Sequence, residues 1–522
     1  MLRVTLQQLS LWQVKEFRLD RVTAHLRLPS VRAQLVSPLA LAKWGALAWW
    51  LVDPAWSSAR SSLFALTTVY AGETAWFVRE IAQRAFRRPH LSPRIGILLS
   101  GVMLAAALLT VLGRVLEWPW TLTLLALDRG LFALVAAIVF GTVPVTAWKR
   151  RRIIRRAAHR MRAISGLTTV GITGSFGKSS TKEFLALLAG ARFHVLKTPA
   201  NTNTDVGIAQ VILKDLTEQH TLFVCEMGAY RLGEIARAAA LVHPRIGILA
   251  AVRDQHLALF GSLEELARAK GELLRALPET GVAIVNGDDP MCVRLSRESP
   301  AARVVRYGFR EGNDVRGEKL SVRRDQFHLT VRSRGTTHQV DVPLLGGHQA
   351  GNLLGAWAAA EVLGVSPDEL AARAPILRPL PRTMEPRTGP RNTFVVDDTY
   401  SANPDGVAAA LEYLPAAAAR TTVVILTTMI ELGSASAAAH RRIGETLRRV
   451  KPDLTVVTAR DFARDLIAGA ANGGSDVPLH IVVEPRPERA FSRIEPLLGA
   501  GTVVLLEGRI PESLRQKFLS SA

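Results

Sequence analysis

The sequence predicts an α/β fold: two domains built on parallel sheets, preceded by an α-helical membrane region. Long uncharged apolar runs are confined to the first 150 of the 522 residues. From residue 168 onward, short β-branched runs alternate with alanine-rich helical stretches, the pattern of a parallel sheet wrapped by helices. A proline-rich linker, 375–390, separates two such series. We therefore expect a membrane region at 1–150, a first α/β domain at 166–380 and a second at 388–522.

The membrane region contains two apolar runs, 95–113 and 131–148, each about the length of a helix that crosses a bilayer core. Basic residues flank the outer ends of the pair: Arg84, Arg87, Arg88 and Arg94 before it, and Lys149, Arg150, Arg151, Arg152, Arg155 and Arg156 after it. Positive charge at both outer ends predicts a helical hairpin with both ends in the cytoplasm. A buried hairpin in a soluble protein is the alternative.

Two weaker segments, 39–52 and 63–78, come earlier, and Lys43, Asp53 and Glu73 interrupt or bound them. Three placements are open for these segments: they span the bilayer, they lie in its interface, or they pack on the hairpin. The region therefore holds two to four transmembrane helices, of which we favour four. Either number predicts a multi-pass protein of the inner (cytoplasmic) membrane with cytoplasmic catalytic domains.

Composition limits the classes of function. The net charge of +20 suits nucleic acid, an anionic membrane face or an anionic substrate. Much of the arginine lies beside the apolar runs without interleaved aromatic residues, which favours the membrane over nucleic acid. The two cysteines, Cys225 and Cys292, form no CxxC pair, which excludes a disulfide scaffold and a cysteine-based zinc site and fits a reducing compartment.

The first α/β domain is expected to contain strands at 168–173, 221–226, 246–252 and 282–286. Residues 304–342 indicate several short strands with turns, which we expect to form a small antiparallel sheet in the same domain. The second series begins near Phe394 and includes strands at 421–427, 454–458 and 502–506.

Residues 173–180, TGSFGKSS, form the sharpest motif, because they lie between the strand that ends near 172 and a helix expected to start near Thr181. Glycines let such a loop turn its N–H groups toward phosphate oxygens. Lys178 would reach the outer phosphates of ATP, and the Ser179 hydroxyl would hold Mg²⁺. The longer form of the motif would place a glycine where the chain has Ile172. The predicted nucleotide-binding residues of the loop are Gly174, Ser175, Gly177, Lys178, Ser179 and Ser180.

Further motifs follow in order: EMGA at 226–229, GEI at 233–235, HL at 256–257 with FGS at 260–262, AKGE at 269–272, HQAGN at 348–352 and DDTYSANP at 397–404. Over roughly residues 166–510, this series resembles the Mur ligases, and most closely the branch that adds D-alanyl-D-alanine to a UDP-muramoyl-tripeptide. The resemblance implies a phosphate-loop central domain followed by a Rossmann-like C-terminal domain. It also implies an ADP-forming, ATP-dependent acid–amino-acid ligase, which activates a carboxylate as an acyl phosphate that an amine then attacks.

The resemblance assigns roles to particular residues. Lys178, Glu226, His256 and Lys270 would form the catalytic group, in which Ser179, Glu226 and His256 hold Mg²⁺. In the family the lysine that matches Lys270 is carbamylated, which turns an ammonium into an anion able to bind metal. Asn352 resembles the asparagine that packs on adenine, Arg382 an arginine that contacts ATP phosphates, and Asp398 an aspartate that reaches the ribose. For His348 and Asn203, a turn role and a ligand contact remain open.

Three departures from the family pattern bear on the substrates. The family's N-terminal domain that grips UDP has no counterpart before Gly166, where the membrane segments lie. The family's YNANP and its glycine–acid–methionine become YSANP at 400–404 and TTM at 427–429. Its late lysine–glycine–serine–arginine becomes EGRI at 507–510. These changes indicate a different acceptor or a different amine.

The main hypothesis is a membrane-tethered ligase of cell-wall peptide synthesis that joins an amino acid or dipeptide to a carboxylate acceptor, which is nucleotide-linked or lipid-linked. One alternative is a chain-extending ligase of the polyglutamate type, which shares the ATP core. Another is a membrane scaffold that binds nucleotide without turnover, which the changes at Thr427 and Glu507 would support.

Overall fold

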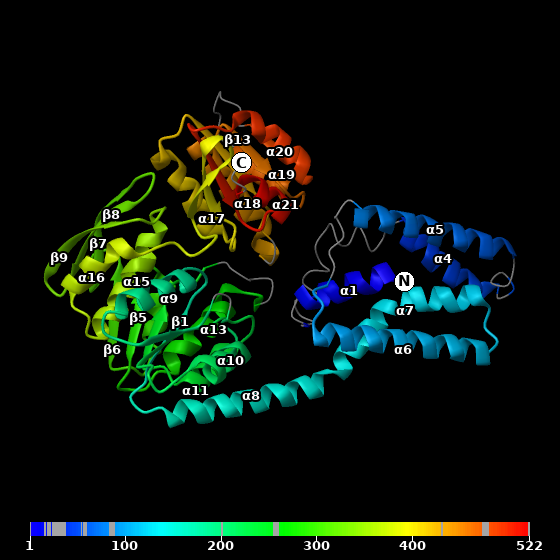
Figure 1. The fold of residues 1–522 in the computed structure, drawn as a ribbon, viewed down its shortest axis with the longest axis horizontal. Coiled ribbons are helices and arrows are strands. Elements are labelled where there is room, and N and C mark those ends of the chain that lie inside the picture. Colours follow the sequence, from blue (N-terminus) through cyan, green and yellow to red (C-terminus); the bar gives the residue numbers. More distant parts are fainter. Residues whose placement is uncertain are drawn as a thin grey trace. The chain divides into compact units, whose positions relative to one another are not determined.

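A computed structural model describes residues 2–14, 17, 22, 38–53, 55, 60–82, 89–199, 202–253, 260–429, 432–471 and 480–519 (Figure 1). The chain divides into two compact units, Met1–Arg151 and Arg152–Ala522.

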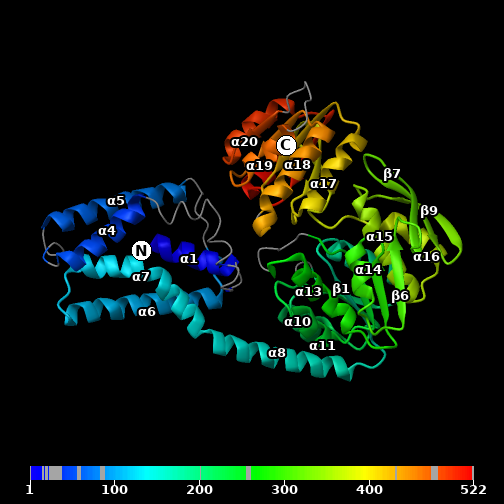
Figure 2. The same cartoon turned by 180° about the vertical axis from the view of Figure 1, so that it is seen from behind.

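The first unit is helical (Figure 2). Its helices are α1 (Leu2–Val14), α4 (Pro38–Val52), α5 (Arg60–Ala82), α6 (Pro93–Val115), α7 (Trp120–Gly141) and the beginning of α8 (Val143–Ala163). Helix α6 begins sharply, because Ser92 accepts a hydrogen bond from the Ile95 N–H and Pro93 occupies the first turn. Helices α6 and α7 pack on each other.

By length and composition alone, two helical stretches of the described chain could cross a membrane: Pro93–Val115 and Ala133–Ala163. The first contains the predicted run 95–113. The second predicted run, 131–148, is divided between α7 and α8 at Thr142. The weaker segments are helical too, as α4 and α5.

The charged residues inside the weaker segments pair with one another. Lys43 Nζ on α4 lies 2.6 Å from Glu73 Oε2 on α5 and 3.1 Å from Asp128 Oδ2 on α7. Arg129 Nη2 lies 2.7 Å from the same Asp128 oxygen. Because these ion pairs are largely buried, they fix α4 and α5 onto α7, which explains how an apolar helical unit accommodates the charges.

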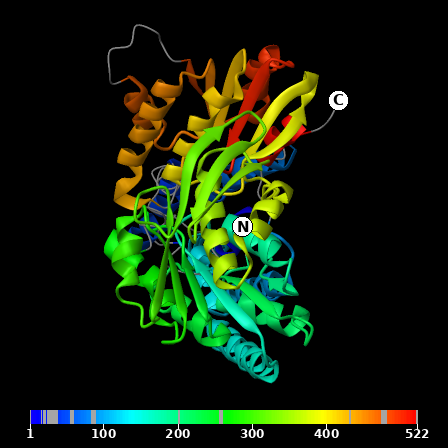
Figure 3. The ribbon, with the colours of Figure 1, turned by 90° about the vertical axis from the view of Figure 1, so that its left-hand side faces the viewer.

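The second unit begins with a nine-stranded sheet in the order β2-β3-β1-β4-β5-β6-β7-β8-β9 (Figure 3). Its strands are β1 (Thr168–Thr173), β2 (Val195–Lys197), β3 (Leu222–Glu226), β4 (Ile246–Leu249), β5 (Val282–Asn286), β6 (Arg303–Gly308), β7 (Val315–Val322), β8 (Phe327–Ser333) and β9 (Thr336–Val342). Neighbours from β2 to β7 are parallel, and β7 to β9 are antiparallel.

The strands expected over 304–342 do not form a sheet of their own. Strand β6 pairs with β5, and β7 joins β6 where Tyr307 lies opposite Val315. The antiparallel strands therefore extend the parallel sheet and satisfy the backbone groups of what would otherwise be its exposed edge.

Helices cover both faces of this sheet. They are α9 (Lys178–Ala189), α10 (Asp205–Asp215), α11 (Glu234–Val242), α13 (Leu263–Arg275), α14 (Pro290–Ser296), α15 (His348–Val362) and α16 (Pro367–Arg373). Alternate residues of β3 serve the two sides: Leu222 and Val224 belong to the core under α9 and α15, and Phe223 and Cys225 to the core under α8, α10 and α11.

The C-terminal sheet has the order β10-β11-β15-β12-β13-β14. Its strands are β10 (Glu385–Gly389), β11 (Thr393–Asp398), β12 (Thr421–Leu426), β13 (Leu454–Val457), β14 (Ile481–Val483) and β15 (Thr502–Glu507). Its helices are α17 (Pro404–Tyr413), α18 (Ser436–Val450), α19 (Ala463–Ala471), α20 (Pro487–Ile494) and α21 (Glu512–Leu519). All pairings are parallel except that of β10 with β11.

The predicted proline-rich linker is shorter than 375–390. Its last residues form β10, which pairs antiparallel with β11. Because β10 is an edge strand, Pro386 can lie in it without removing a hydrogen bond from the interior of the sheet.

Candidate active site

The phosphate loop joins β1 to α9, and α9 begins at Lys178, earlier than the predicted Thr181. Its two glycines are required by geometry. Gly174 has φ +153°, and a β-carbon there would lie 2.9 Å from the Ala251 nitrogen. Gly177 has φ +78°, and a β-carbon there would overlap Asn352 Oδ1. Side chains at either position would be strained, so the loop needs glycine.

The loop is tied to the end of the neighbouring strand β4. The Ser175 N–H donates to the Ala251 carbonyl at 2.7 Å. Ser175 Oγ lies 3.0 Å from both the nitrogen and the carbonyl oxygen of Arg253. These hydrogen bonds hold Ser175 in place and give it a structural role in the loop.

Lys178 is held against the loop that it follows. Its ammonium donates to the carbonyls of Gly174 and Ser175, at 2.7 and 3.1 Å. Burial lowers the pKa of Lys178, while Glu226 opposes that shift. The side chain therefore lies where outer phosphates would meet the helix N-terminus, and phosphate oxygens could take over these hydrogen bonds.

Glu226 ends β3, the strand beside β1, and is held on both carboxylate oxygens. Its Oε2 accepts a hydrogen bond from Ser179 Oγ at 2.8 Å, and its Oε1 accepts one from Asn203 Nδ2 at 3.2 Å. Its own N–H donates to Thr198 Oγ1. The structure thus brings together the two described residues predicted to hold Mg²⁺, and it places Asn203 beside them.

Two further lysines surround this carboxylate. Lys182, which the sequence analysis did not single out, is fully buried with Nζ 3.5 Å from Glu226 Oε2. Its spacing from Lys178, one helical turn, was the available signal, since residues four apart share a helix face. Lys270 on α13 is buried as well, and burial, with Lys178 beside it, lowers its pKa to about 7. Glu226, Glu234 and Glu272 oppose that shift.

The other residues predicted in the first α/β domain have separate positions. His256 lies outside the described residues. Ser180 is buried within α9. Asn352, in the first turns of α15, donates to Gln349 Oε1 at 3.0 Å and lies against Gly177, so it adjoins the loop. His348, the first residue of α15, is buried, which lowers its pKa to about 4 and keeps the ring neutral.

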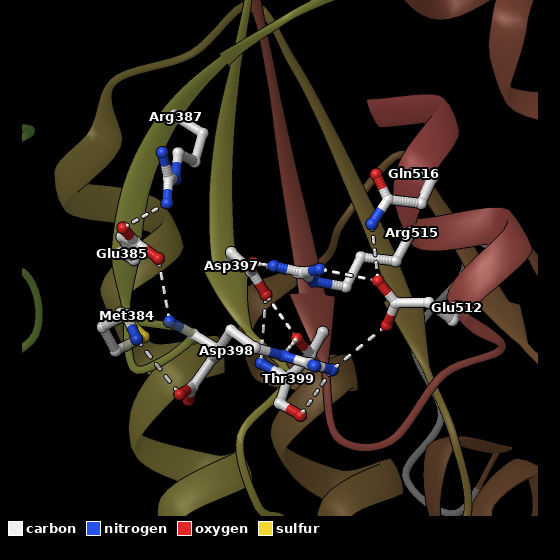
Figure 4. A network of polar contacts seen from close by, with 10 residues as sticks. Met384, Glu385, Arg387, Asp397, Asp398, Thr399, Glu512, Arg515 and Gln516 are labelled. Atoms are coloured by element: carbon white, nitrogen blue, oxygen red, sulfur yellow. Dashed lines mark hydrogen bonds and ion pairs between the residues drawn. The ribbon is translucent and has the colours of Figure 1, made fainter. Parts of the chain in front are cut away.

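Arg382 lies just before β10 in the C-terminal domain, and Asp398 ends β11. Figure 4 shows Asp398 beside Met384 and Thr399. Arg382 Nε donates to Thr399 Oγ1 at 2.9 Å, and its Nη2 lies 3.5 Å from Glu512. Asp398 Oδ1 accepts a hydrogen bond from the Met384 N–H at 3.1 Å. The two predicted nucleotide contacts are therefore built into the junction where the linker enters the second sheet.

The departures within the C-terminal domain, at 400–404, 427–429 and 507–510, meet at one edge of this sheet. Glu507 ends β15 opposite Asp398. A β-carbon at Gly508 would lie 3.1 Å from Ala402 Cβ and 3.1 Å from Thr427 Cγ2. Burial raises the pKa of Asp398 to about 7, and burial with Asp398 nearby raises the pKa of Glu507. The charge change at Glu507 thus gives two neighbouring buried carboxyls.

The described residues fit ATP and Mg²⁺. Mg²⁺ prefers hard oxygen ligands and is usually bound by one or two carboxylates together with substrate phosphates. Ser179 Oγ and the Glu226 carboxylate offer such oxygens beside the loop N–H groups and Lys178. The same site surrounds one carboxylate with three lysines, which suits a polyanionic ligand.

Comparison with known proteins agrees with this geometry. Residues 172–360 match the Mur ligase middle domain, and 384–510 match the Mur ligase, glutamate ligase domain. The UDP-N-acetylmuramoyl-tripeptide--D-alanyl-D-alanine ligase of Mycobacterium leprae is 33% identical over 369 residues, 66% of this chain and 71% of that protein. The ligase of the same name from Escherichia coli is 30% identical over 312 residues, 60% of this chain and 66% of that protein.

Solved structures agree in fold. The MurF ligase of Thermotoga maritima in complex with ADP has a TM-score of 0.62 and 27% identity, over 71% of this chain and 83% of that chain. MurF from Acinetobacter baumannii has a TM-score of 0.65 at 24% identity, over 71% of this chain and 81% of that chain. The α/β fold, with a central domain and a C-terminal domain, is confirmed. The chain belongs to the Mur ligase family.

Proposed function

We propose that this Mur ligase family member is an ATP-dependent, ADP-forming amide-bond ligase of peptidoglycan peptide synthesis that works at the cytoplasmic membrane. The gathering of Lys178, Ser179 and Glu226 at the carboxyl ends of adjacent strands carries the proposal. Lys270 of α13 interacts electrostatically with this group. Ligands of open α/β sheets bind at that edge.

The chain's residues support phosphoryl transfer mainly by position and charge. The loop N–H groups and Lys178 would hold the β- and γ-phosphates. Mg²⁺, held by Ser179 and Glu226, would offset the charge of the phosphates. An acceptor carboxylate oxygen then attacks the γ-phosphorus, which releases ADP and gives an acyl phosphate. The amine nitrogen attacks its carbonyl carbon, loses a proton, and expels phosphate to leave the amide.

Lys270 supports a further step of this proposal. Its lowered pKa makes a substantial share of the buried amine neutral near pH 7. A neutral amine can add to CO₂ and release a proton, which gives a carbamate anion beside Glu226. The family resemblance implies this carbamylation. Of the three lysines near Glu226, Lys270 would then lose its positive charge and gain two oxygens that can bind metal.

The substrates belong to the proposal as well. The relatives named above add D-alanyl-D-alanine to a UDP-muramoyl-tripeptide, and this chain spans 71% of the M. leprae protein but 58% of the ligase from Mycobacterium tuberculosis. We propose a dipeptide or amino acid as the amine and a nucleotide-linked or lipid-linked carboxylate as the acceptor. Support comes from the helical first unit and from the departures gathered around Glu507.

The membrane location rests on the two long apolar helical stretches of the described chain. Large apolar side chains of α6 point outward, among them Ile97, Met103, Leu104, Leu108 and Val111. Exposed apolar helix faces of this kind suit lipid. Arginines at the C-terminal end of the second stretch favour a cytoplasmic position for the catalytic domains.

The proposed function can be tested by phosphate release from ATP and Mg²⁺ with the purified chain in lipid nanodiscs. Acceptors would be nucleotide-linked and lipid-linked peptides, offered with D-alanyl-D-alanine or single amino acids. We expect release that needs both substrates and is lost in Lys178→Ala, with Lys214→Ala on α10 as an exposed control. A product ladder with glutamate would favour the polyglutamate alternative. ATP binding without turnover under every mixture would favour the scaffold.

A further inference from the structure

Helix α8 carries two faces of opposite chemistry after Trp148. Its second half packs on the ligase core through Ile153, Ile154, Ala157, Ala158 and Met161, which join α10 and α11 in one apolar cluster. Arg160 reinforces this contact, because Nε and Nη2 donate to the Leu216 carbonyl at 3.0 and 2.6 Å. Figures 1 and 2 both show α8 alongside α10 and α11. The second half of α8 is therefore an integral part of the ligase domain.

The opposite face of α8 is exposed and basic. At about 3.6 residues per turn, six exposed basic residues fall within an arc of about 140°, away from the packed face. They are Arg151, Arg152, Arg155, Arg156, His159 and Arg162. Acidic side chains are absent from the whole of α8, whose sequence is VPVTAWKRRRIIRRAAHRMRA. The face thus presents a row of guanidinium groups with no carboxylate on its own helix.

We propose that this arginine face of α8 binds the anionic headgroups of the bilayer surface and so lays the ligase domain against the membrane. The inference rests on the proposed membrane anchor and goes beyond it, because an anchor alone would leave the domain free to tumble at the end of its helix. The positive charge of the arginine face is complementary to the negative charge of an anionic bilayer surface. Each basic residue near an anionic leaflet increases the equilibrium constant for membrane binding by about fivefold. Several in a row therefore outweigh the entropy that is lost when the helix is held at the bilayer surface.

Continuity along the chain supports the same occupant. Helix α8 starts at Val143, within the predicted apolar run, so its arginines directly follow the proposed span in the sequence. Guanidinium groups suit lipid phosphates because they donate in a planar fork. The contact would turn the layer formed by α8, α10 and α11 toward the bilayer.

The test uses the full chain in nanodiscs, with a fluorophore on His159→Cys in the arginine face. Cys225 and Cys292 are buried, so the introduced thiol is labelled selectively. Quenching by headgroup spin-labelled lipid is compared between phosphatidylcholine and a mixture that is about one third phosphatidylglycerol. We expect stronger quenching with the anionic lipid, loss of that increase in high salt, and loss of it when Arg151, Arg155, Arg156 and Arg162 become glutamine.

A matched control removes four exposed arginines elsewhere, at Arg297, Arg303, Arg323 and Arg332, and should keep the increase. The inference is overturned if quenching does not depend on lipid charge, or if the increase with anionic lipid persists after the four α8 substitutions. A second fluorophore at exposed Leu108→Cys, read with acyl-chain spin labels, separates this failure from failure of the anchor. Quenching at position 108 without quenching at 159 rejects only the arginine face, and no quenching at 108 rejects the anchor and the inference together.

Discussion

Ser179 Oγ donates a hydrogen bond of 2.8 Å to Glu226 Oε2, which connects the first turn of α9 to the end of β3. Two residues 47 positions apart in sequence thus share one point at the carboxyl edge of the sheet. The hydroxyl and carboxylate are the oxygens that a phosphate-bound Mg²⁺ would need. Removing either should therefore affect the metal more than the nucleotide.

Ser179→Ala should raise the Mg²⁺ concentration that half-activates phosphate release by about 10- to 100-fold, and Glu226→Gln by at least as much. The measurement is a Mg²⁺ titration of turnover, together with calorimetry of Mg²⁺ binding in the presence of ADP. Glu264→Gln is the control, because that carboxylate pairs with Arg294 and is exposed. Unchanged Mg²⁺ dependence in both variants would remove Ser179 and Glu226 from the metal site.

Lys182→Met should lower the free energy of unfolding by about 3 kcal/mol, because it removes the cation of a buried ion pair and leaves Glu226 less compensated. Chemical denaturation of the chain in detergent measures the change. Lys214→Met, at an exposed position on α10, should have little effect. Equal stability of the two variants would mean that Lys182 contributes nothing to holding Glu226.

The phosphate loop and most strands could be predicted because local pattern determines them. The predicted strands at 168–173 and 282–286 have the bounds of β1 and β5. Glycine positions and β-branched runs leave few alternatives over such short stretches. The order of the strands depends on long-range pairing, so the sequence did not reveal that β7–β9 would extend the main sheet.

The residues of the candidate site also divide into those that local sequence could predict and those that depend on long-range packing. Lys178, Ser179 and Glu226 were found because each belongs to a recognisable motif at a strand end or helix start. Lys182 was missed since its role depends on burial beneath Glu226, which a sequence does not display. The pairing of Asp398 with Glu507 was missed for the same reason, because it requires β11 and β15 to be neighbours.

Gly177→Ala should destabilise the chain by about 1 to 2 kcal/mol and weaken ADP binding. Its φ of +78° disfavours a side chain, and the new β-carbon would overlap Asn352 Oδ1. Adding Asn352→Ala should relieve the overlap and restore part of the stability, while the backbone cost remains. Gly499→Ala is the control, since nothing lies within 4 Å of a β-carbon there. A Gly177→Ala chain as stable as the control would contradict the loop geometry.

Glu507→Gln should stabilise the chain at pH 8, by about 1 to 3 kcal/mol, and much less at pH 5. The pKa of Asp398 is raised to about 7 and that of Glu507 is raised too, chiefly by burial. In the unfolded chain these carboxyls lose their protons near pH 4. Between about pH 4 and 7 the folded state therefore binds more protons, and the free energy of unfolding falls as pH rises.

The substitution removes one of the two titrating groups and the like charge beside Asp398, so the fall in stability between pH 4 and 7 should become shallower. Denaturant titrations at several pH values measure the slope for both chains. Glu495→Gln, at an exposed carboxylate, should leave the slope unchanged. A Glu507→Gln chain with the parent's slope would mean that folding does not raise the pKa of Glu507.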